Sequence, residues 1–272
     1  MTPYFVPVGL VLGGLLIGLG RLPIGGGVLA LTVLLGAQIL PRAMPSRQPA
    51  LSGPRLRLLA SNIYLGRGDV KAIVELVREQ DVDVLHVVEL TPEAAEDLDR
   101  AGLFELLPHR VFQPVEDGRG TGIASRHPLQ PLDLAGPSRL EQPSARVDLG
   151  TAAVDVVAVH PVPPTMSAAD WKSEIAGMPA VTADGPIRIL AGDFNATLDH
   201  AVFRKLLRTG YQDAAALRGG GLRGTWPSSR FPPRVTLDHV LVDRRAAVAD
   251  YRVFEVPETD HRAVLAEVIL PG

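Results

Sequence analysis

Asp193 and Asn195 stand one residue apart, directly after an apolar run at residues 187–191. Such a run indicates a buried strand, and side chains at i and i+2 of an extended segment point to the same side. We therefore expect both side chains to project together from the end of a core strand, with Gly192 allowing a sharp exit. A rigid strand end suits a hydrolase that holds a cation or an attacking water.

Other apolar runs also meet polar residues at their ends. These are Asn62, Glu89 and His160 at the ends of three runs, Asp238 within an expected strand at Val235–Val242, and Asp260-His261 directly before the last run. Polar residues at the mouths of strands build a site at one edge of a sheet core. The sequence therefore predicts one shared site.

The residue types at these positions suit metal-assisted hydrolysis of a phosphoester. The hard oxygen ligands are Asn62, Glu89, Asp193, Asn195 and Asp260. Oxygen-only sites suit Mg²⁺, and Mn²⁺ is a possible substitute. His160 and His261 are the proton carriers of the set. A carboxylate such as Asp238 beside His261 would fix the tautomer of the imidazole and stabilise its cation.

The elements that must position these residues lie after residue 55. Short apolar runs outnumber the helical patterns, of which residues 70–77 are one example with apolar side chains at i, i+3, i+4 and i+7. This mixture predicts an α/β fold in which two packed sheets have helices outside. Thr225-Trp226-Pro227 is either the floor of the substrate site or a packing element. His86 is interpreted as a core histidine, and His239 should point away from Asp238.

Composition narrows the function classes. The chain of 272 residues has no Cys, which excludes disulfides, thiolate zinc sites and a Cys nucleophile. Residues 1–57 contain five Arg and no acidic residue, leaving 22 basic and 30 acidic side chains in the remainder, a formal charge of −8. A body this acidic shows no broad basic footprint for nucleic acid.

The N-terminal segment predicts a membrane anchor. Two apolar, uncharged runs, Tyr4–Gly20 and Ile24–Leu40, flank a turn at Arg21, and each is near the lower limit of about 17 residues for a membrane helix. The alternatives are a buried hairpin or a cleaved signal peptide. A signal peptide has positive charges before its apolar region, and no charged residue precedes the first run here. We expect an anchor of two transmembrane helices at residues 1–40, a linker at 41–54 and a catalytic domain at 55–272.

The ordered polar motifs resemble those of the endonuclease/exonuclease/phosphatase superfamily, over roughly residues 55 to 270. The motifs are Asn62 at a strand end, Val88-Glu89-Leu90, Val159-His160-Pro161, Gly192-Asp193-Phe194-Asn195, Leu237-Asp238-His239 and Thr259-Asp260-His261-Arg262. The resemblance implies a four-layer α/β/β/α sandwich and Mg²⁺-dependent phosphoester hydrolysis.

The resemblance also implies roles. Residues matching Asn62 and Glu89 bind the metal in that superfamily, and the one matching Asp260 helps with metal or water. Those matching Asp193 and Asn195 position the water and contact phosphate. The residues matching His160 and His261 contact the scissile phosphate, the latter paired with Asp238. Val88 in place of Gln and Tyr64 in place of a carboxylate depart from the repair nucleases and argue against their specificity.

The membrane segment, the linker and this body together resemble a bacterial membrane subgroup that includes teicoplanin-resistance-type proteins, whose catalytic domain faces outward. Arg42 and Arg47 against the single Arg21 favour the opposite side, but by a margin too small to decide under the positive-inside rule. We therefore expect a multi-pass protein of the cell membrane with an extracytoplasmic catalytic domain.

The resulting hypothesis is a membrane-anchored Mg²⁺-dependent phosphoester hydrolase acting on a lipid-linked or small phosphoester or pyrophosphate. The membrane contact would run through residues 4–40. An extracytoplasmic nuclease acting on DNA is the second reading, which the acidic body does not favour. A catalytically inactive binding module is the third, against which the complete set of metal and His positions argues.

Overall fold

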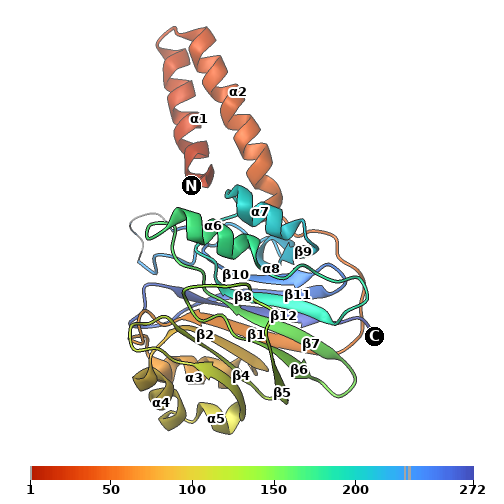
Figure 1. The fold of residues 1–272 in the computed structure, drawn as a ribbon. Helices are drawn as coiled ribbons and strands as arrows, with labels where there is room; N and C mark the ends of the chain where they lie inside the picture. Colours follow the sequence, from red (N-terminus) through yellow and green to blue (C-terminus); the bar gives the residue numbers. More distant parts are fainter. Residues whose placement is uncertain (1, 230, 232–233) are drawn as a thin grey trace.

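The computed structural model describes residues 2–229, 231 and 234–272. Two six-stranded sheets pack face to face with helices on both outer faces, and a pair of helices projects from one end of this body (Figure 1). The expected α/β/β/α sandwich, with two mixed sheets flanked by helices, is confirmed.

The first sheet has one parallel pair, β1 and β2, among antiparallel neighbours. Its strands, in spatial order, are β11 (Ala247–Glu255), β12 (Arg262–Ile269), β1 (Arg55–Asn62), β2 (Val84–Leu90), β4 (Gly120–Ser125) and β3 (His109–Gln113).

The second sheet repeats this plan around the parallel pair β7 and β8. Its strands, in spatial order, are β5 (Leu129–Leu132), β6 (Ser144–Asp148), β7 (Ala153–Val159), β8 (Ile187–Asp193), β10 (Asp238–Asp243) and β9 (Tyr211–Asp213). The strand expected at Val235–Val242 begins three residues later, because Val235 instead pairs across a short bridge with Trp226.

Alternation along β1 shows how the layers form. Leu56, Leu58 and Ala60 face the second sheet and join the central core, whereas Leu59 faces outward into a second core beneath the helices. This two-residue period is what a strand buried on both faces requires. The helices over this sheet are α3 (Val70–Glu79), α4 (Pro92–Arg100) and α5 (Leu103–Leu106).

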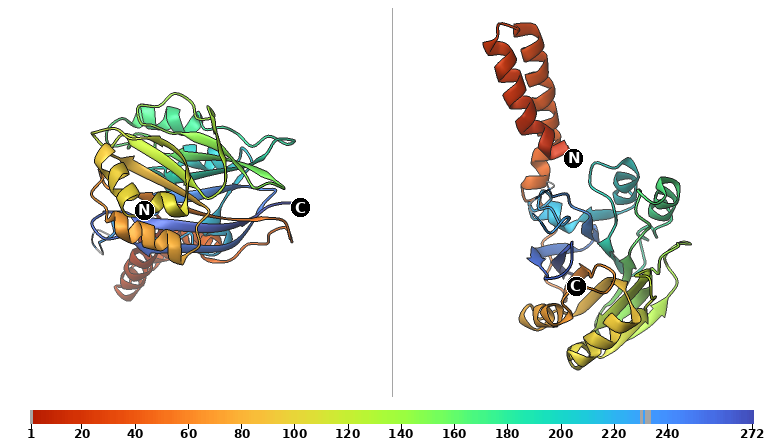
Figure 2. Two further views of the ribbon diagram at one scale, coloured as in Figure 1. Left: turned by 90° about the horizontal axis from the view of Figure 1, so that it is seen from below. Right: turned by 90° about the vertical axis from the view of Figure 1, so that its left-hand side faces the viewer.

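A third core lies outside the second sheet. Phe194, Phe203 and Trp171 pack there beneath α6 (Ala168–Ala176) and α7 (Ala201–Leu207), and the short helix α8 (Ala214–Leu217) closes the central core near the same end. The end-on views separate the layers (Figure 2).

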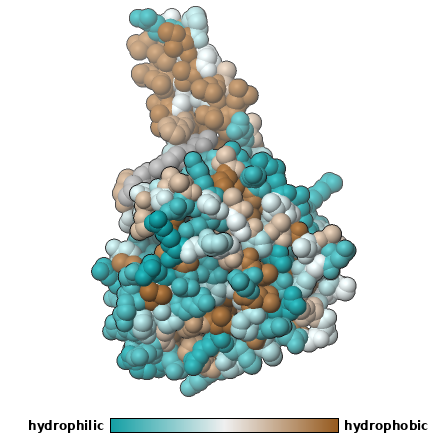
Figure 3. Space-filling model, in the orientation of Figure 1, coloured by the Kyte–Doolittle hydropathy of each residue, from teal (hydrophilic) through white to brown (hydrophobic). Residues whose placement is uncertain are grey.

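The N-terminal helices project from the body and, among the described residues, contact it only near their base. They are α1 (Thr2–Gly18) and α2 (Leu22–Ile39), followed by the 3₁₀ turn η1 (Leu40–Ala43). They pack against each other, and most of their apolar side chains are exposed (Figure 3). The helical segment Leu22–Ala43 is long and apolar enough to cross a membrane, while Pro3–Gly18 is apolar but shorter.

Candidate active site

The topology explains why the polar strand ends meet. β1, β2, β7 and β8 all run toward the same edge of the sandwich, and the antiparallel strands β10 and β12 begin at that edge. Residues that follow the first four strands and residues that precede the last two therefore converge. The expectation of one shared site at a sheet edge agrees with this arrangement.

The exit of β8 is shaped by Gly192. Its φ of 145° is a conformation that L side chains rarely adopt, and a Cβ there would overlap the backbone of Val159 on the parallel neighbour β7. The next residue, Asp193, is buried, and its Oδ1 accepts a hydrogen bond from the Asn195 amide at 2.8 Å. Asn195 has a φ of 48° and donates through Nδ2 to the Pro161 carbonyl at 3.2 Å. The turn thus holds both side chains over the strand end.

Asn62 and Glu89 form the neighbouring part of the site. Nδ2 of Asn62 donates to Oε1 of Glu89 at 2.9 Å and to Oδ2 of Asp193 at 3.2 Å. Its Oδ1 accepts from the Tyr64 backbone, and Oε2 of Glu89 accepts from the Leu65 backbone at 2.7 Å. Glu89 lies at a β-bulge with a φ of 61°. Because bulges re-aim side chains, this one directs Glu89 into the cleft.

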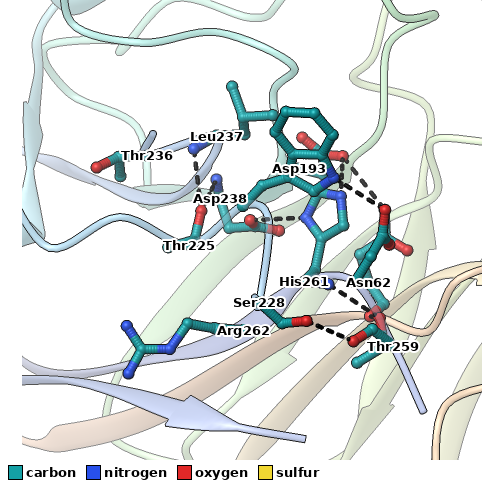
Figure 4. A network of polar contacts seen from close by, with 12 residues as sticks. Asn62, Asp193, Thr225, Ser228, Thr236, Leu237, Asp238, Thr259, His261 and Arg262 are labelled. Carbon is teal, nitrogen blue, oxygen red and sulfur yellow. Dashed lines mark hydrogen bonds and ion pairs between the residues drawn. The ribbon is translucent and has the colours of Figure 1, made fainter. Parts of the chain in front are cut away.

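His261 lies between two carboxylates (Figure 4). Its Nδ1 is 2.9 Å from Oδ2 of Asp238, and its Nε2 is 3.7 Å from Oδ2 of Asp193. Burial alone would lower the pKa of His261, but the charges of these two carboxylates outweigh it and raise that pKa to about 10. The imidazole is therefore a cation at neutral pH. Burial raises the pKa of Asp193.

His160 has the opposite electrostatic character. Burial lowers its pKa, so the ring is neutral at physiological pH. Its Nε2 lies 3.9 Å from Oε1 of Glu89, and its backbone amide donates to Oε1 of Gln142 at 2.9 Å. Its Nδ1 is buried and has no hydrogen-bond partner among the described residues. The two histidines of the site therefore differ in charge.

Trp226 and Asp260 complete the wall. Nε1 of the indole donates to Oδ2 of Asp260 at 2.9 Å, and both residues line a cleft of about 760 Å³ together with Glu89, His160 and Asp193. Of the two roles considered for the Trp226 turn, this contact favours a part in the substrate site.

Divalent-cation chemistry fits the residues of this cleft. Its charged lining is dominated by Glu89, Asp117, Asp193, Asp199 and Asp260. An acidic lining repels a phosphate unless a cation intervenes, and its oxygen donors are those that Mg²⁺ prefers. A buried cluster of two Asp residues and one His is also present among the described residues.

Two clusters of side chains that include carboxylates are candidates to hold such an ion. Asp193, Asp238 and His261 bring one ligand atom each within 4.8 Å of one another. However, His261 is cationic, and a protonated imidazole has no lone pair for a metal. The second cluster contains Glu89 and Asn62, and Asn62 Nδ2 also reaches Asp193. The Asn62 amide presents nitrogen to the carboxylates, so ligation through Oδ1 requires the amide to rotate.

Two other histidines behave as expected from their positions. His86 is fully buried, its Nδ1 lies 3.0 Å from the Ala191 carbonyl, and burial lowers its pKa to about 4. His239 points away from the catalytic residues. Its Nδ1 lies 2.6 Å from Oδ2 of Asp213, and its Nε2 lies 2.9 Å from the Ala196 carbonyl. It therefore supports the turn that carries Asn195 from behind.

The sequence interpretation missed two hydroxyls that position the site. Oγ1 of Thr225 accepts from the backbone amides of Leu237 and Asp238, and Oγ1 of Thr259 donates to the Asn62 carbonyl at 2.9 Å. Thr225 and Thr259 each begin a motif that the sequence already marks, Thr225-Trp226-Pro227 and Thr259-Asp260-His261-Arg262. Their hydrogen-bond partners are distant in the chain, so the sequence gives no signal for these contacts.

Comparison with known proteins places this geometry in a family. A sequence model of the Endonuclease/Exonuclease/phosphatase family matches residues 59–261. No curated protein sequence matches the chain.

Solved structures share the fold at low identity. An endonuclease/exonuclease/phosphatase from Beutenbergia cavernae has 20% identity and a TM-score of 0.61, covering 80% of this chain and 72% of its own. TDP2 of D. rerio, complexed with a single-strand DNA product, has 16% identity and a TM-score of 0.61, with 79% and 98% coverage. Sphingomyelinase C from Streptomyces griseocarneus has 18% identity and a TM-score of 0.54, with 79% and 99% coverage.

The match over most of the body, together with the sandwich and the converging strand ends, identifies the chain as a member of the Endonuclease/Exonuclease/phosphatase family, whose enzymes are phosphoesterases and nucleases.

Proposed function

We propose that the protein is a membrane-anchored, Mg²⁺-dependent phosphoester hydrolase that acts on a lipid-linked or small phosphoester or pyrophosphate. One observation carries the proposal. His261 lies buried between Asp238 and Asp193, and Asn62 joins this group to Glu89 in the same cleft. A His–Asp pair and a carboxylate that can bind a metal, both facing one cleft, suit in-line attack on phosphorus.

The metal would be held by the oxygen side of the site. Glu89 and Asp260 would supply carboxylates, and Asn62 would add its amide oxygen. A bound Mg²⁺, or Mn²⁺ in its place, would neutralise the charge that develops on the phosphoryl oxygens. Nδ2 of Asn62 bridges Glu89 and Asp193, which keeps two carboxylates close together without direct repulsion.

The remaining residues would act on water and phosphate. Asp193 would orient a water molecule and take its proton as the oxygen bonds to phosphorus and the bond to the leaving group breaks. His261 would donate its Nε2 proton in a hydrogen bond to a phosphoryl oxygen. Asn195 has a second amide proton to offer to phosphate, because only one is used by Pro161. His160, which is neutral, would contact the same phosphate.

The acidic cleft favours a compact phosphate group over DNA. Arg119 is the one Arg in the lining of this described cleft, and both oxygens of Asp117 bind its guanidinium at 2.8 Å. Nucleic-acid binding depends on many unpaired cations. Proteins with this fold include a TDP2 solved with a DNA product and a sphingomyelinase C named for a lipid, so the fold is compatible with either class, and the acidic lining supports a compact phosphate substrate.

The anchor would consist of both N-terminal helices, with the body outside the cytoplasm. Its helices carry no charged side chain between residues 22 and 39 and none between 2 and 18. Protease added to intact cells tests the side: cleavage of the body supports this orientation, and protection of the body until the cells are lysed contradicts it.

The activity is tested on the full chain in detergent. We expect turnover of 4-nitrophenyl phosphate, bis(4-nitrophenyl) phosphate or pyrophosphate with Mg²⁺ or Mn²⁺, loss with a chelator, and loss in Asp193→Ala. Cleavage of plasmid DNA far above every other substrate would instead establish the nuclease. Absence of turnover on the whole panel would leave the inactive binding module.

A further inference from the structure

The helix pair is seated on the body beside the mouth of the catalytic cleft. Arg42, at the end of the pair, donates through Nη1 to Oδ1 of Asp199 at 2.8 Å, and its carbonyl accepts from the Gly221 amide at 2.9 Å. At the start of α1, which lies at the same body-facing end of the pair, the Tyr4 hydroxyl donates to the Arg234 carbonyl (Figure 1). These contacts from both helices fix the direction in which the pair leaves the body.

One residue of α1 belongs to the cleft itself. Phe5, in the first turns of the helix, lines the same 760 Å³ cleft as His160, Asp193 and His261. A single continuous hollow therefore leads from the catalytic residues to the base of the apolar helix pair. Phe5 is 60% exposed, so its ring is available to an apolar group entering there.

The length of α1 sets the position of the body against a bilayer. Its 17 residues span about 25 Å at about 1.5 Å per residue, whereas the hydrocarbon core of a bilayer is about 30 Å thick. The helix is therefore no longer than the hydrocarbon core is thick, and it cannot act as a spacer between the body and the membrane. If the pair spans the bilayer, the surface around its base meets the lipid headgroups.

The exposed large apolar residues of the body line, or lie close to, the two hollows that residues of α1 also line. Within the part of residues 55–272 that the structure describes, the large apolar side chains in the exposed class are Tyr64, Leu65, Met166, Leu222 and Phe231. We call them the apolar rim. The first three line the catalytic cleft, and Leu222 lines a small hollow with Tyr4 and Arg42.

Phe231, which is 84% exposed, belongs to the same end of the molecule. Its carbonyl accepts from the Ser229 hydroxyl, and Ser229 in turn accepts through its own carbonyl from Arg234, the residue that binds Tyr4. Each residue of the apolar rim thus lies in or beside a hollow that α1 also lines, or is linked to α1 through Arg234. Single apolar residues on a protein surface are common and need no explanation. Several that gather around the same cleft indicate an interaction surface.

We propose that the apolar rim is a bilayer-contact surface and that the cleft receives the headgroup of a lipid phosphoester from the bilayer that holds the helix pair. This inference rests on the proposed function. The lipid's phosphate would reach Asp193 and His261 while its apolar chains stay beside Phe5 and the rim. The helix base, the rim and the mouth of the cleft would then all contact the same bilayer.

The contact is tested without any activity measurement. Met166→Trp and the control Gln130→Trp are placed in vesicles of phosphatidylcholine brominated near the headgroup. Gln130 lies on the exposed edge strand β5, at the end of the body opposite the helix pair (Figure 1). We expect the fluorescence added by Met166→Trp to be quenched at least twofold and that added by Gln130→Trp to be unchanged. Equal fluorescence in brominated and ordinary lipid for Met166→Trp would overturn the proposal.

The substrate is tested with matched probes. Full-length protein in vesicles is given phosphatidic acid in the same bilayer and, separately, soluble 4-nitrophenyl phosphate, each with Mg²⁺. A second pair, sphingomyelin and bis(4-nitrophenyl) phosphate, covers phosphodiesters. For the pair that is hydrolysed, we expect Met166→Asp to lower the ratio of lipid rate to soluble rate at least tenfold, and Gln130→Asp to keep it within twofold.

The outcomes separate the two proposals. Hydrolysis of a soluble probe with no hydrolysis of its lipid partner, or an unchanged ratio in Met166→Asp, overturns the lipid inference and leaves the hydrolase in place. Absence of hydrolysis of every probe overturns the hydrolase itself. Pairing of chains through the rim, seen as a dimer in detergent that Met166→Asp dissociates, would assign the rim to a second copy and also overturn the bilayer contact.

Discussion

Nδ1 of His261 lies 2.9 Å from Oδ2 of Asp238, and both residues are buried. Asp238 begins β10 directly opposite Asp193 on β8, and His261 directly precedes β12 in the other sheet. The pair therefore connects the two sheets at their shared edge. It also keeps the imidazole charged, because the carboxylate offsets the cost of burying the cation.

The alkaline limit of activity should follow this pair. The pKa of His261 is raised to about 10, so hydrolysis that needs the imidazolium should fall only as pH rises through that value. Asp238→Asn removes one of the two negative charges that raise the pKa. We expect its alkaline limb to move to lower pH and its kcat at neutral pH to fall about 100-fold.

The measurement is a pH–rate profile of kcat with a soluble phosphoester. Asp250→Asn is the matched control, because Asp250 is a partly exposed carboxylate on β11 paired with Arg252. Its profile should coincide with that of the wild type. An alkaline limb that stays in place in Asp238→Asn would show that the carboxylate does not set the charge of His261.

Stability should depend on pH through the same histidine. Between 6.5, the ordinary pKa of His, and about 10, the folded chain binds a proton at His261 that the unfolded chain has released. Stability from this group is therefore complete below about pH 6.5 and is lost as pH rises through about 10. The free energy of unfolding of the metal-free protein, measured at several pH values, should decline over this range. His261→Gln should make that decline with pH less steep. An identical slope in both proteins would contradict the assignment.

The sequence was sufficient to predict the fold class and the residues of the strand mouths. Asn62, Glu89 and Asp193 each end an apolar run, and parallel strands bring such ends to one edge. These are local patterns joined by a general rule of topology. The predicted metal ligands remain predictions, because the direction of the Asn62 amide and the reach of Asp260 depend on neighbours that are distant in the chain.

Other features had no local signal. The backbone amide of Leu65 donates to Glu89 from a turn in which Tyr64 and Leu65 both have positive φ. Neither residue is Gly, Asn or Asp, the types that usually mark this conformation. The entry of Phe5 into the cleft is also invisible in sequence, because it depends on how the Arg42–Asp199 contact seats the helix pair.

Removing the charge of Glu89 should weaken metal dependence rather than folding. Glu89→Gln keeps an acceptor for the Leu65 amide but replaces Oε1, the oxygen that accepts from Asn62, with an uncharged NH₂ group, so the Asn62 amide must turn over to pair with it. We expect the Mg²⁺ concentration for half-maximal activity to rise at least about tenfold, with a smaller loss of rate at saturating Mg²⁺. Glu96→Gln, an exposed carboxylate on α4, is the control and should titrate as the wild type. A Mg²⁺ titration of Glu89→Gln that overlays the wild type would place the ion elsewhere.

The buried pair of His239 and Asp213 should support the site from behind. Their atoms are 2.6 Å apart, and both side chains are almost fully buried. Burial would lower the pKa of His239, but the charge of Asp213 raises it, so the ring can donate at both nitrogens, to Asp213 and to the Ala196 carbonyl.

Asp213→Asn removes the charge that favours the protonated imidazole of His239 and weakens a buried hydrogen bond, so we expect the free energy of unfolding to fall by about 1–3 kcal/mol. Because Ala196 follows Asn195, we also expect a loss of kcat with little change in metal affinity. Denaturant unfolding and a Mg²⁺ titration of the same samples measure the two effects. The matched control is Asp148→Asn, an exposed carboxylate at the end of β6, which should lower neither quantity. Wild-type stability in Asp213→Asn would mean that His239 is neutral in the folded chain and that the pair contributes no ionic support to the turn bearing Asn195.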